Sequence, residues 1–335
     1  MADTELHAAR YWRSLDDETV ECLLCPWHCH IKPDAVGRCD VRENRNGRLY
    51  TINYGQITSI ALDPIEKKPL YHFHPGTEIL SVGSFGCNLS CRFCQNWQIA
   101  HGRPPTRYMS PQELADLAVE YASRGSIGVA YTYNEPIVSC EYILDSAPLV
   151  APAGLKNVMV TNGIIEPEPL EALLPLIDAM NVDIKSMDDD FYKRICGGRA
   201  QPPRATVERA ITDCHIEITN LLIPGENDAD DQIEALVNWA ASVSPDLPLH
   251  LSAYHPAHEF TAPPTPDETL KRAFDIATRK LHFVYVGNAR VAGTTDTRCP
   301  NCGTVAVKRN GYTTQLESIS EGRCSACGAA LNIVQ

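Results

Sequence analysis

Residues 86–96 read Gly86-Cys87-Asn88-Leu89-Ser90-Cys91-Arg92-Phe93-Cys94-Gln95-Asn96 and follow closely on an apolar run, Glu78 to Gly83. The three cysteines have the spacing Cys-x3-Cys-x2-Cys. Three thiolates on one short loop can bind three irons of a [4Fe–4S] cluster and leave the fourth iron without a protein ligand. An iron left open in this way is a place for substrate chemistry. A zinc site or buried free thiols are the alternatives, but zinc usually takes four ligands in paired Cys-x2-Cys knuckles.

The cysteines near the C-terminus form two knuckles of similar sequence. These are Cys299-Pro300-Asn301-Cys302-Gly303 and Cys324-Ser325-Ala326-Cys327-Gly328. A glycine after the second cysteine lets the backbone amides turn toward the sulfur. Apolar alternation in residues 304–307 and 313–316 predicts a hairpin between the knuckles. We therefore expect a zinc ribbon with a structural Zn²⁺, and an accessory iron–sulfur cluster is the alternative.

A third group of cysteines lies near the N-terminus and consists of Cys22, Cys25, Cys29 and Cys39. Its asymmetric spacing suits either Zn²⁺ or a second [4Fe–4S] cluster, since both take four thiolates. The remaining three cysteines stand alone in the sequence, and we expect them to be small buried hydrophobes: Cys140, Cys196 and Cys214.

Composition excludes several classes of protein. The chain of 335 residues is long enough for one large domain with small appendages, and 44% hydrophobic residues support a sizeable core. A net charge of −13 argues against a general nucleic-acid or membrane-surface binder. No apolar run reaches the length of about 18 residues that a membrane span needs. Fourteen cysteines without a secretory signal pattern indicate metal ligands in a reducing cytosol, so we expect a cytoplasmic protein.

Apolar runs alternate with helix-like stretches from about residue 78 onward. The predicted strands are residues 78–83, 128–132, 157–161, 179–184, 215–223 and 249–253, and the predicted helices are residues 111–124, 167–175, 203–213, 229–242 and 266–278. Ser110 and Glu113 form a capping-box pattern at the first helix. Strand–helix repetition predicts parallel strands in an α/β fold. Polar groups that follow such strands would meet at the carboxyl ends of the sheet.

The order of these motifs resembles the AmmeMemoRadiSam system enzymes, relatives of pyruvate formate-lyase activating enzyme in the radical S-adenosylmethionine (SAM) superfamily. Besides the cysteine groups it includes Glu66-Lys67-Lys68-Pro69-Leu70-Tyr71-His72, Tyr133-Asn134-Glu135-Pro136, Thr161-Asn162-Gly163, Asp183-Ile184-Lys185, Ile223-Pro224-Gly225 and Gly287-Asn288. The resemblance covers about residues 20–330. It implies a partial (βα)6 TIM-like barrel at 76–290, a Cys-rich N-terminal module at 1–75 and a zinc ribbon at 291–335.

The resemblance also implies roles for individual residues. Cys87, Cys91 and Cys94 would hold the [4Fe–4S] cluster, whose open iron binds SAM. Glu135, Asn162, Asp183 and Lys185 would lie against SAM, with the Glu135 carboxylate receiving its amino group. His255 would lie near adenosine, where it or Lys185 could act in catalysis. The alternatives are a helix cap for Glu135, a salt bridge for Asp183 and Lys185, and a hydrogen-bonded core position for His255.

Two departures from the family pattern bear on the substrate. Tyr133-Asn134 stands where related enzymes have two glycines, and Thr219 stands where the activating enzymes have an arginine. The predicted function is reductive cleavage of SAM to a 5′-deoxyadenosyl radical that abstracts hydrogen from a small-molecule or protein substrate. Glycyl-radical activation is one alternative, and a metal-bearing RNA-binding or RNA-modifying protein is another. The expected partners are a flavodoxin or ferredoxin as electron donor, with Memo-like and AMMECR-type proteins implied by the family name.

Overall fold

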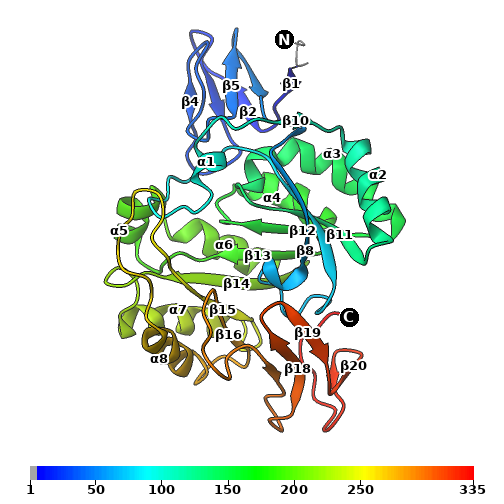
Figure 1. Cartoon of the computed structure of the whole chain (residues 1–335). Coiled ribbons are helices and arrows are strands. Elements are labelled where there is room, and N and C mark those ends of the chain that lie inside the picture. The colour runs from blue at the N-terminus through cyan, green and yellow to red at the C-terminus, as the bar shows by residue number, and fades with distance from the viewer. Residues whose placement is uncertain (1–5) are drawn as a thin grey trace.

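The computed structural model describes residues 6–335 and is built around one eight-stranded sheet (Figure 1). The strand order is β16-β15-β14-β13-β12-β11-β9-β8. Every neighbouring pair is parallel except β8 and β9, which are antiparallel. The strands are β8 (Ser59–Pro64), β9 (Glu78–Gly83), β11 (Ser126–Tyr131), β12 (Lys156–Thr161), β13 (Ala179–Asp183), β14 (His215–Leu222), β15 (Leu249–Ala253) and β16 (Val284–Gly287).

All six strands expected from the sequence are present, and two more extend the sheet. The strand β16 is only four residues long, too short for a clear periodic pattern, and β8 turns back along β9 instead of continuing the strand–helix repeat. The two ends of the sheet, β16 and β8, are not paired with each other in the part of the chain described. The sheet is thus an open α/β arrangement with seven parallel strands.

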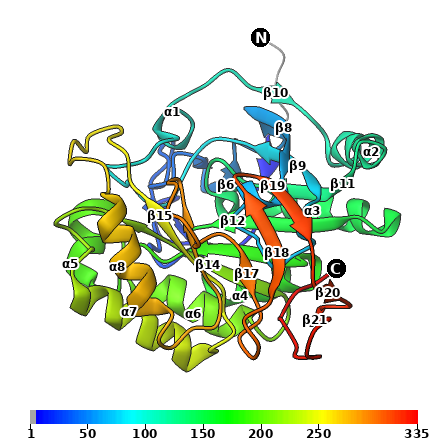
Figure 2. The ribbon, with the colours of Figure 1, turned by 60° about the horizontal axis from the view of Figure 1, so that its bottom comes forward.

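Helices follow the parallel strands and lie on the outer side of the sheet (Figures 1 and 2). Their bounds are α1 (Trp97–Ala100), α2 (Pro111–Ala122), α3 (Cys140–Val150), α4 (Pro167–Leu173), α5 (Asp189–Phe191), α6 (Gln201–Ala210), α7 (Asp230–Val243) and α8 (Asp267–Ala277). The capping box is confirmed, because the Glu113 amide donates to Ser110 Oγ at 3.2 Å and the Ser110 amide donates to the Glu113 carboxylate at 2.7 Å. The sequence did not predict α3, whose interior Pro148 argues against a helix.

The N-terminal region forms two small antiparallel sheets at one end of the molecule. Their strands are β1 (His7–Ala8), β5 (Arg42–Arg45) and β6 (Arg48–Thr51) in one sheet, and β2 (Trp12–Ser14), β3 (Val20–Cys22) and β4 (His30–Ile31) in the other. A short pair joins β7 (Gln56–Ile57) to β10 (Arg107–Tyr108). Val20, Leu24 and Leu49 are buried in the same apolar core as the central strands. The predicted module boundaries stay predictions.

The C-terminal region forms a second strand group at the opposite end (Figure 1). It contains β17 (Thr297–Arg298), β18 (Val305–Asn310), β19 (Thr313–Leu316), β20 (Ile319–Ser320) and β21 (Arg323–Cys324). The strands β18 and β19 form the hairpin that the sequence predicted between the two cysteine knuckles.

A buried polar layer lies between this C-terminal group and the amino ends of the parallel strands. The Glu217 carboxylate accepts hydrogen bonds from the amides of Tyr71 and His72 and lies 2.6 Å from His250 Nε2. Arg309 of β18 donates to the Tyr71 carbonyl at 2.7 Å, and its side chain is buried. Buried charges persist when they are paired and hydrogen-bonded, so this layer holds the C-terminal group on the sheet. None of the helices in residues 6–335 has the length and apolarity needed to cross a bilayer.

Candidate functional site

The three-cysteine loop, residues 86–96, connects β9 to α1 at the carboxyl ends of the parallel strands. Cys91 is buried, and Cys87 and Cys94 are partly exposed. The Leu89 amide lies 3.4 Å from Cys87 Sγ and donates a hydrogen bond to it. Among residues 6–335, no three ligand atoms that include these sulfurs lie within 4.8 Å of one another. Three thiolates spaced more widely than one metal ion requires fit a polynuclear cluster, in which each binds a different iron.

Cys196 contacts this loop, which the sequence did not predict. It ends a π-helical turn, Tyr192–Cys196, whose carbonyls accept hydrogen bonds from the Ser90 and Arg92 amides. Cys196 packs with Cys91 in one buried cluster, and its thiol lowers the pKa of Cys91. Cys196 was expected to be a buried hydrophobe; it is fully buried, and it also supports a predicted cluster ligand.

Asp183 and Lys185 form an ion pair beside the cysteines. The distance from Lys185 Nζ to Asp183 Oδ2 is 2.7 Å, and the two side chains are 13% and 29% exposed. Burial alone would lower the pKa of Lys185, but Asp183 and Cys91 outweigh it and raise that pKa, so the ammonium is retained. The salt bridge that the sequence left open as an alternative is therefore present. It places one cation and one anion at the loop.

Glu135 lies beneath the same loop and accepts three hydrogen bonds from the protein. Its Oε1 accepts from Thr161 Oγ1 at 2.6 Å and from the Ile137 amide at 3.1 Å, and its Oε2 accepts from the Asn162 amide at 2.7 Å. Burial raises the pKa of Glu135 to about 7, although the hydrogen bonds from Thr161 and Asn162 oppose the shift. The bond to Ile137 caps the short helix Pro136–Ser139, the alternative role considered for this residue.

Asn162 ties this carboxylate region to the cysteines. Its side-chain amide donates to Asn88 Oδ1 at 2.8 Å and lies 3.8 Å from Cys87 Sγ. The Asn88 amide in turn donates to the Ile164 carbonyl at 2.7 Å. These two asparagines fix the position of the loop relative to the end of β12.

His255 follows β15 at the same edge of the sheet but is exposed to solvent. Its Nε2 lies 3.3 Å from the Asn288 carbonyl. This position differs from a hydrogen-bonded core histidine, which was the alternative for this residue.

Tyr133 explains why the first of the two family glycines can be replaced here. The residue has a φ of 72°, in the left-handed region that glycine adopts without cost. Its hydroxyl donates to Asp63 Oδ2 at 2.5 Å, and Lys68 Nζ lies 4.7 Å from its ring centroid. Lys68 is 2% exposed and bonds the same carboxylate at 2.8 Å. These contacts hold the strained tyrosine against the strand ends, and sequence patterns carried no signal for them.

The four N-terminal cysteines line one cavity. Cys22, Cys25 and Cys39 are buried, and Cys29 is partly exposed. Burial raises the pKa of Cys25 to about 12 and that of Cys39 to about 11. Without a bound metal the thiols of Cys25 and Cys39 would stay protonated at neutral pH, and metal binding would release these protons.

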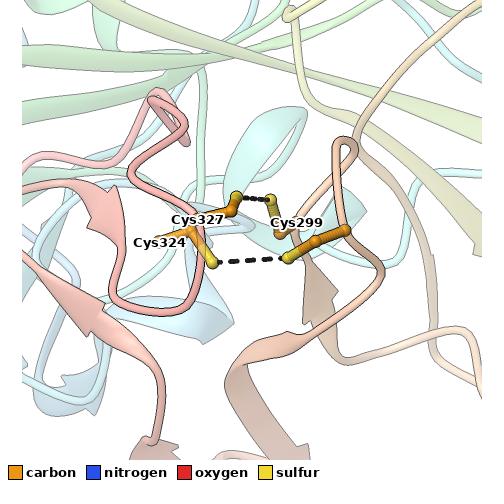
Figure 3. A group of neighbouring side chains, drawn as sticks. Cys299, Cys324 and Cys327 are labelled. Atoms are coloured by element: carbon orange, nitrogen blue, oxygen red, sulfur yellow. Dashed lines mark hydrogen bonds between the residues drawn. The ribbon is translucent and has the colours of Figure 1, made fainter.

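The four C-terminal cysteines form a compact group (Figure 3). Their ligand atoms all lie within 4.8 Å of one another, with 3.5 Å between the sulfurs of Cys299 and Cys327 and 3.7 Å between those of Cys302 and Cys324. Four thiolates bound tetrahedrally to one zinc at about 2.3 Å lie about 3.8 Å apart. A hydrogen bond with the Thr304 hydroxyl lowers the pKa of Cys302 to about 6, which favours the metal-binding thiolate. The donor set and spacing fit a single Zn²⁺.

Comparisons with known proteins agree with this geometry. Residues 81–240 match the model of the radical SAM superfamily. The chain is 40% identical to Uncharacterized protein MJ0808 of Methanocaldococcus jannaschii, over 98% of this chain and 100% of that protein. It is 26% identical to the pyruvate formate-lyase-activating enzyme of Clostridium pasteurianum, over 51% and 72% of the two chains. A solved radical SAM methyltransferase from Sphaerobacter thermophilus has a similar fold, with a TM-score of 0.51, 16% identity and coverage of 84% and 76%.

Proposed function

Because this chain belongs to the radical SAM superfamily and is an enzyme of that superfamily, we propose that it cleaves SAM reductively to abstract hydrogen from a small molecule. The observation that carries the proposal is the position of Cys87, Cys91 and Cys94 beside the Asp183–Lys185 pair at the carboxyl ends of the parallel strands. In TIM-like barrels this edge is where catalytic groups gather. Cys87, Cys91 and Cys94 would hold a [4Fe–4S] cluster, which when bound would supply the electron that cleaves the sulfonium of SAM to a 5′-deoxyadenosyl radical.

The residues at this edge can divide the recognition of SAM between them. The three cysteines would hold the cluster, and the ammonium of Lys185 would attract the SAM carboxylate. Asp183 and the remaining lone pair on Glu135 Oε2 would accept from the SAM amino group, while Asn162 keeps the loop in register. His255, exposed at the entrance, would meet the adenosine end of SAM or a substrate proton.

Two observations favour a small molecule over a peptide glycine. Thr219 stands in place of the activases' arginine, and its hydroxyl is committed to Asn181 Oδ1 at 2.8 Å. The N-terminal module also packs on the outside of the cysteine loop, where Trp27 Nε1 donates to the Asn88 carbonyl at 2.8 Å and Arg38 donates to the Gly197 carbonyl at 2.7 Å. A covered loop leaves less room for a folded protein partner.

The finer family assignment is also part of the proposal. The motif order supports membership of the AmmeMemoRadiSam system, with Memo-like and AMMECR-type proteins as partners, a structural Zn²⁺ in the C-terminal ribbon and a flavodoxin or ferredoxin as electron donor. Mixing purified partner proteins with this chain and measuring complex formation by light scattering tests the association. Metal analysis of the purified chain tests the zinc.

The experiment that tests the activity is anaerobic reconstitution with iron and sulfide, followed by dithionite and SAM. We expect 5′-deoxyadenosine, measured by mass spectrometry, from the native chain and none from the Cys87→Ala/Cys91→Ala/Cys94→Ala variant. Absence of the product from protein that holds the central cluster and binds SAM would refute the proposal.

Glycyl-radical activation is the second candidate, and the similarity to the activating enzyme of Clostridium pasteurianum favours it. An activase leaves a stable glycyl radical on its partner, which electron paramagnetic resonance (EPR) detects as a signal split by the remaining glycine hydrogen. Formation of that signal on a purified glycyl-radical enzyme would replace the small-molecule proposal.

A further inference from the structure

The N-terminal cysteines surround a cavity that the proposed SAM chemistry does not use. Its wall contains the four cysteines together with Leu24, Trp27, Ile31, Arg42, Asn88 and Val138, among others. The cavity is therefore mainly apolar, apart from the sulfurs, two arginines (Arg38 and Arg42) and one asparagine.

The spacing of the N-terminal sulfurs differs from that of the C-terminal group. In the C-terminal group all four sulfurs lie within 4.8 Å of one another, as a single zinc ion requires. Within the described part of the chain, no three of the N-terminal sulfurs are that close. Four cysteines that line one cavity at this wider spacing match a multinuclear centre rather than a single ion. A [4Fe–4S] cluster meets this condition, because each thiolate binds a different iron.

Arg42 supplies a second, independent observation. Its side chain is 1% exposed and forms two hydrogen bonds of 2.8 Å to the buried Glu141 carboxylate through Nη1 and Nη2. Its Nε is buried and has no hydrogen-bond partner among residues 6–335. Buried donors without a partner are rare and costly. A metal-bound thiolate or a cluster sulfide in the cavity would accept this hydrogen bond, so the orphaned donor indicates a bound metal centre there.

The cavity adjoins the central cysteine loop. Asn88, between Cys87 and Cys91, is part of the cavity wall and accepts a hydrogen bond from Trp27. A Cβ atom on Gly86 would lie 2.8 Å from the Cys39 carbonyl oxygen, so only glycine allows this approach. The two cysteine sites are thus neighbours, joined through Gly86 and Asn88.

We propose that Cys22, Cys25, Cys29 and Cys39 hold a second [4Fe–4S] cluster, fully ligated by cysteine and hydrogen-bonded by Arg42 Nε–H. A cluster with four cysteine ligands has no open iron. The site would therefore take up only inorganic iron and sulfide and would bind no organic ligand. This inference goes beyond the proposed function and does not depend on SAM cleavage.

The deciding experiment uses the full-length Cys87→Ala/Cys91→Ala/Cys94→Ala variant, reconstituted anaerobically with iron, sulfide and equimolar zinc. We expect about four irons per chain and, after dithionite, the EPR signal of a reduced [4Fe–4S] cluster that SAM does not alter. Adding Cys302→Ala/Cys327→Ala to this variant should leave the iron unchanged, which excludes the ribbon as its site. Zinc without iron, or no metal beyond the ribbon's, would overturn the inference.

The matched variant is Cys25→Ala/Cys39→Ala, which keeps the central loop. We expect it to lose the second signal and to retain a signal that changes when SAM is added. A fall in iron from about eight to about four in each variant assigns one cluster to each site. Failure of the proposed function would remove only the SAM-sensitive signal, so the two failures are distinguishable. The central triple variant decides the inference even if the matched variant does not fold.

Discussion

Replacing His72 with glutamine should change how the stability of the protein depends on pH. His72 is fully buried, and its Nε2 lies 2.6 Å from the Tyr285 hydroxyl and its Nδ1 lies 3.1 Å from the Asn332 carbonyl. A carbonyl can only accept, so Nδ1 carries the proton and Nε2 accepts from Tyr285. Burial lowers the pKa of His72 to about 3, and the Arg309 charge nearby acts in the same direction.

The sign follows from comparing the folded and unfolded chains. A histidine with a lowered pKa stays neutral in the fold, while the unfolded chain takes up a proton as the pH falls below about 6.5. The folded state therefore loses stability from about pH 6.5 down to about pH 3. Between pH 7 and pH 5 the loss attributable to His72 is about 2 kcal/mol, at about 1.36 kcal/mol per pKa unit.

The assay is urea unfolding followed by tryptophan fluorescence at pH 7 and pH 5 for the native chain and for His72→Gln. The variant should be less stable at pH 7, but its loss between the two pH values should be smaller by about 2 kcal/mol. His255→Gln, at an exposed position on the other end of the sheet, is the control and should lose as much as the native chain. Equal losses for His72→Gln and the native chain, or a His72 ring that titrates near pH 6.5 by NMR, would refute the reasoning.

Three further predictions concern the site and the C-terminal group. Lys185→Met removes a charge-assisted hydrogen bond of about 1.5–3 kcal/mol and should weaken SAM binding by about 10- to 150-fold, measured by equilibrium dialysis. Lys185→Arg keeps the charge and should bind SAM more tightly than Lys185→Met. Unchanged affinity in Lys185→Met would place the SAM carboxylate elsewhere. Cys302→Ala should abolish zinc binding in the ribbon and lower the thermal unfolding midpoint of that region. The control variant Cys214→Ala should retain the metal. Equal zinc content in the two variants would exclude the four-cysteine site. Arg309→Met leaves Glu66 without its buried cation and should cost about 3–5 kcal/mol of unfolding free energy, measured in urea, and a cost below about 1 kcal/mol would contradict the structural role.

The parts of the fold that sequence reasoning predicted are those with a local cause. The strand Leu249–Ala253 has its predicted bounds, and α2 begins where Ser110 and Glu113 form the capping box. Proline in the third turn hid α3, which is held by the burial of Ile143, Ala147 and Val150 rather than by propensity. Tertiary packing of this kind leaves no periodic signal.

The same division holds for the candidate site. Spacing alone located the three cysteine groups, and the strand order placed Glu135 and Asp183 at one edge of the sheet. The contacts of Cys196 with Cys91, and of Arg42 with Glu141, join residues about a hundred positions apart. Nothing in the local sequence indicates such pairs, because they arise only when the strands assemble.

The buried layer around Glu217 determines from which side ligands can enter and leave the candidate site. Glu217, His250, Tyr285 and Arg309 fill the amino ends of the strands, so a molecule bound at the opposite ends enters and leaves on the same side. Whichever of two ligands sits deeper must then arrive first and depart last. We expect binding of SAM and substrate to be ordered rather than random. An excess of the ligand that binds second should inhibit the enzyme, because that ligand can then occupy the entrance before the first ligand has bound.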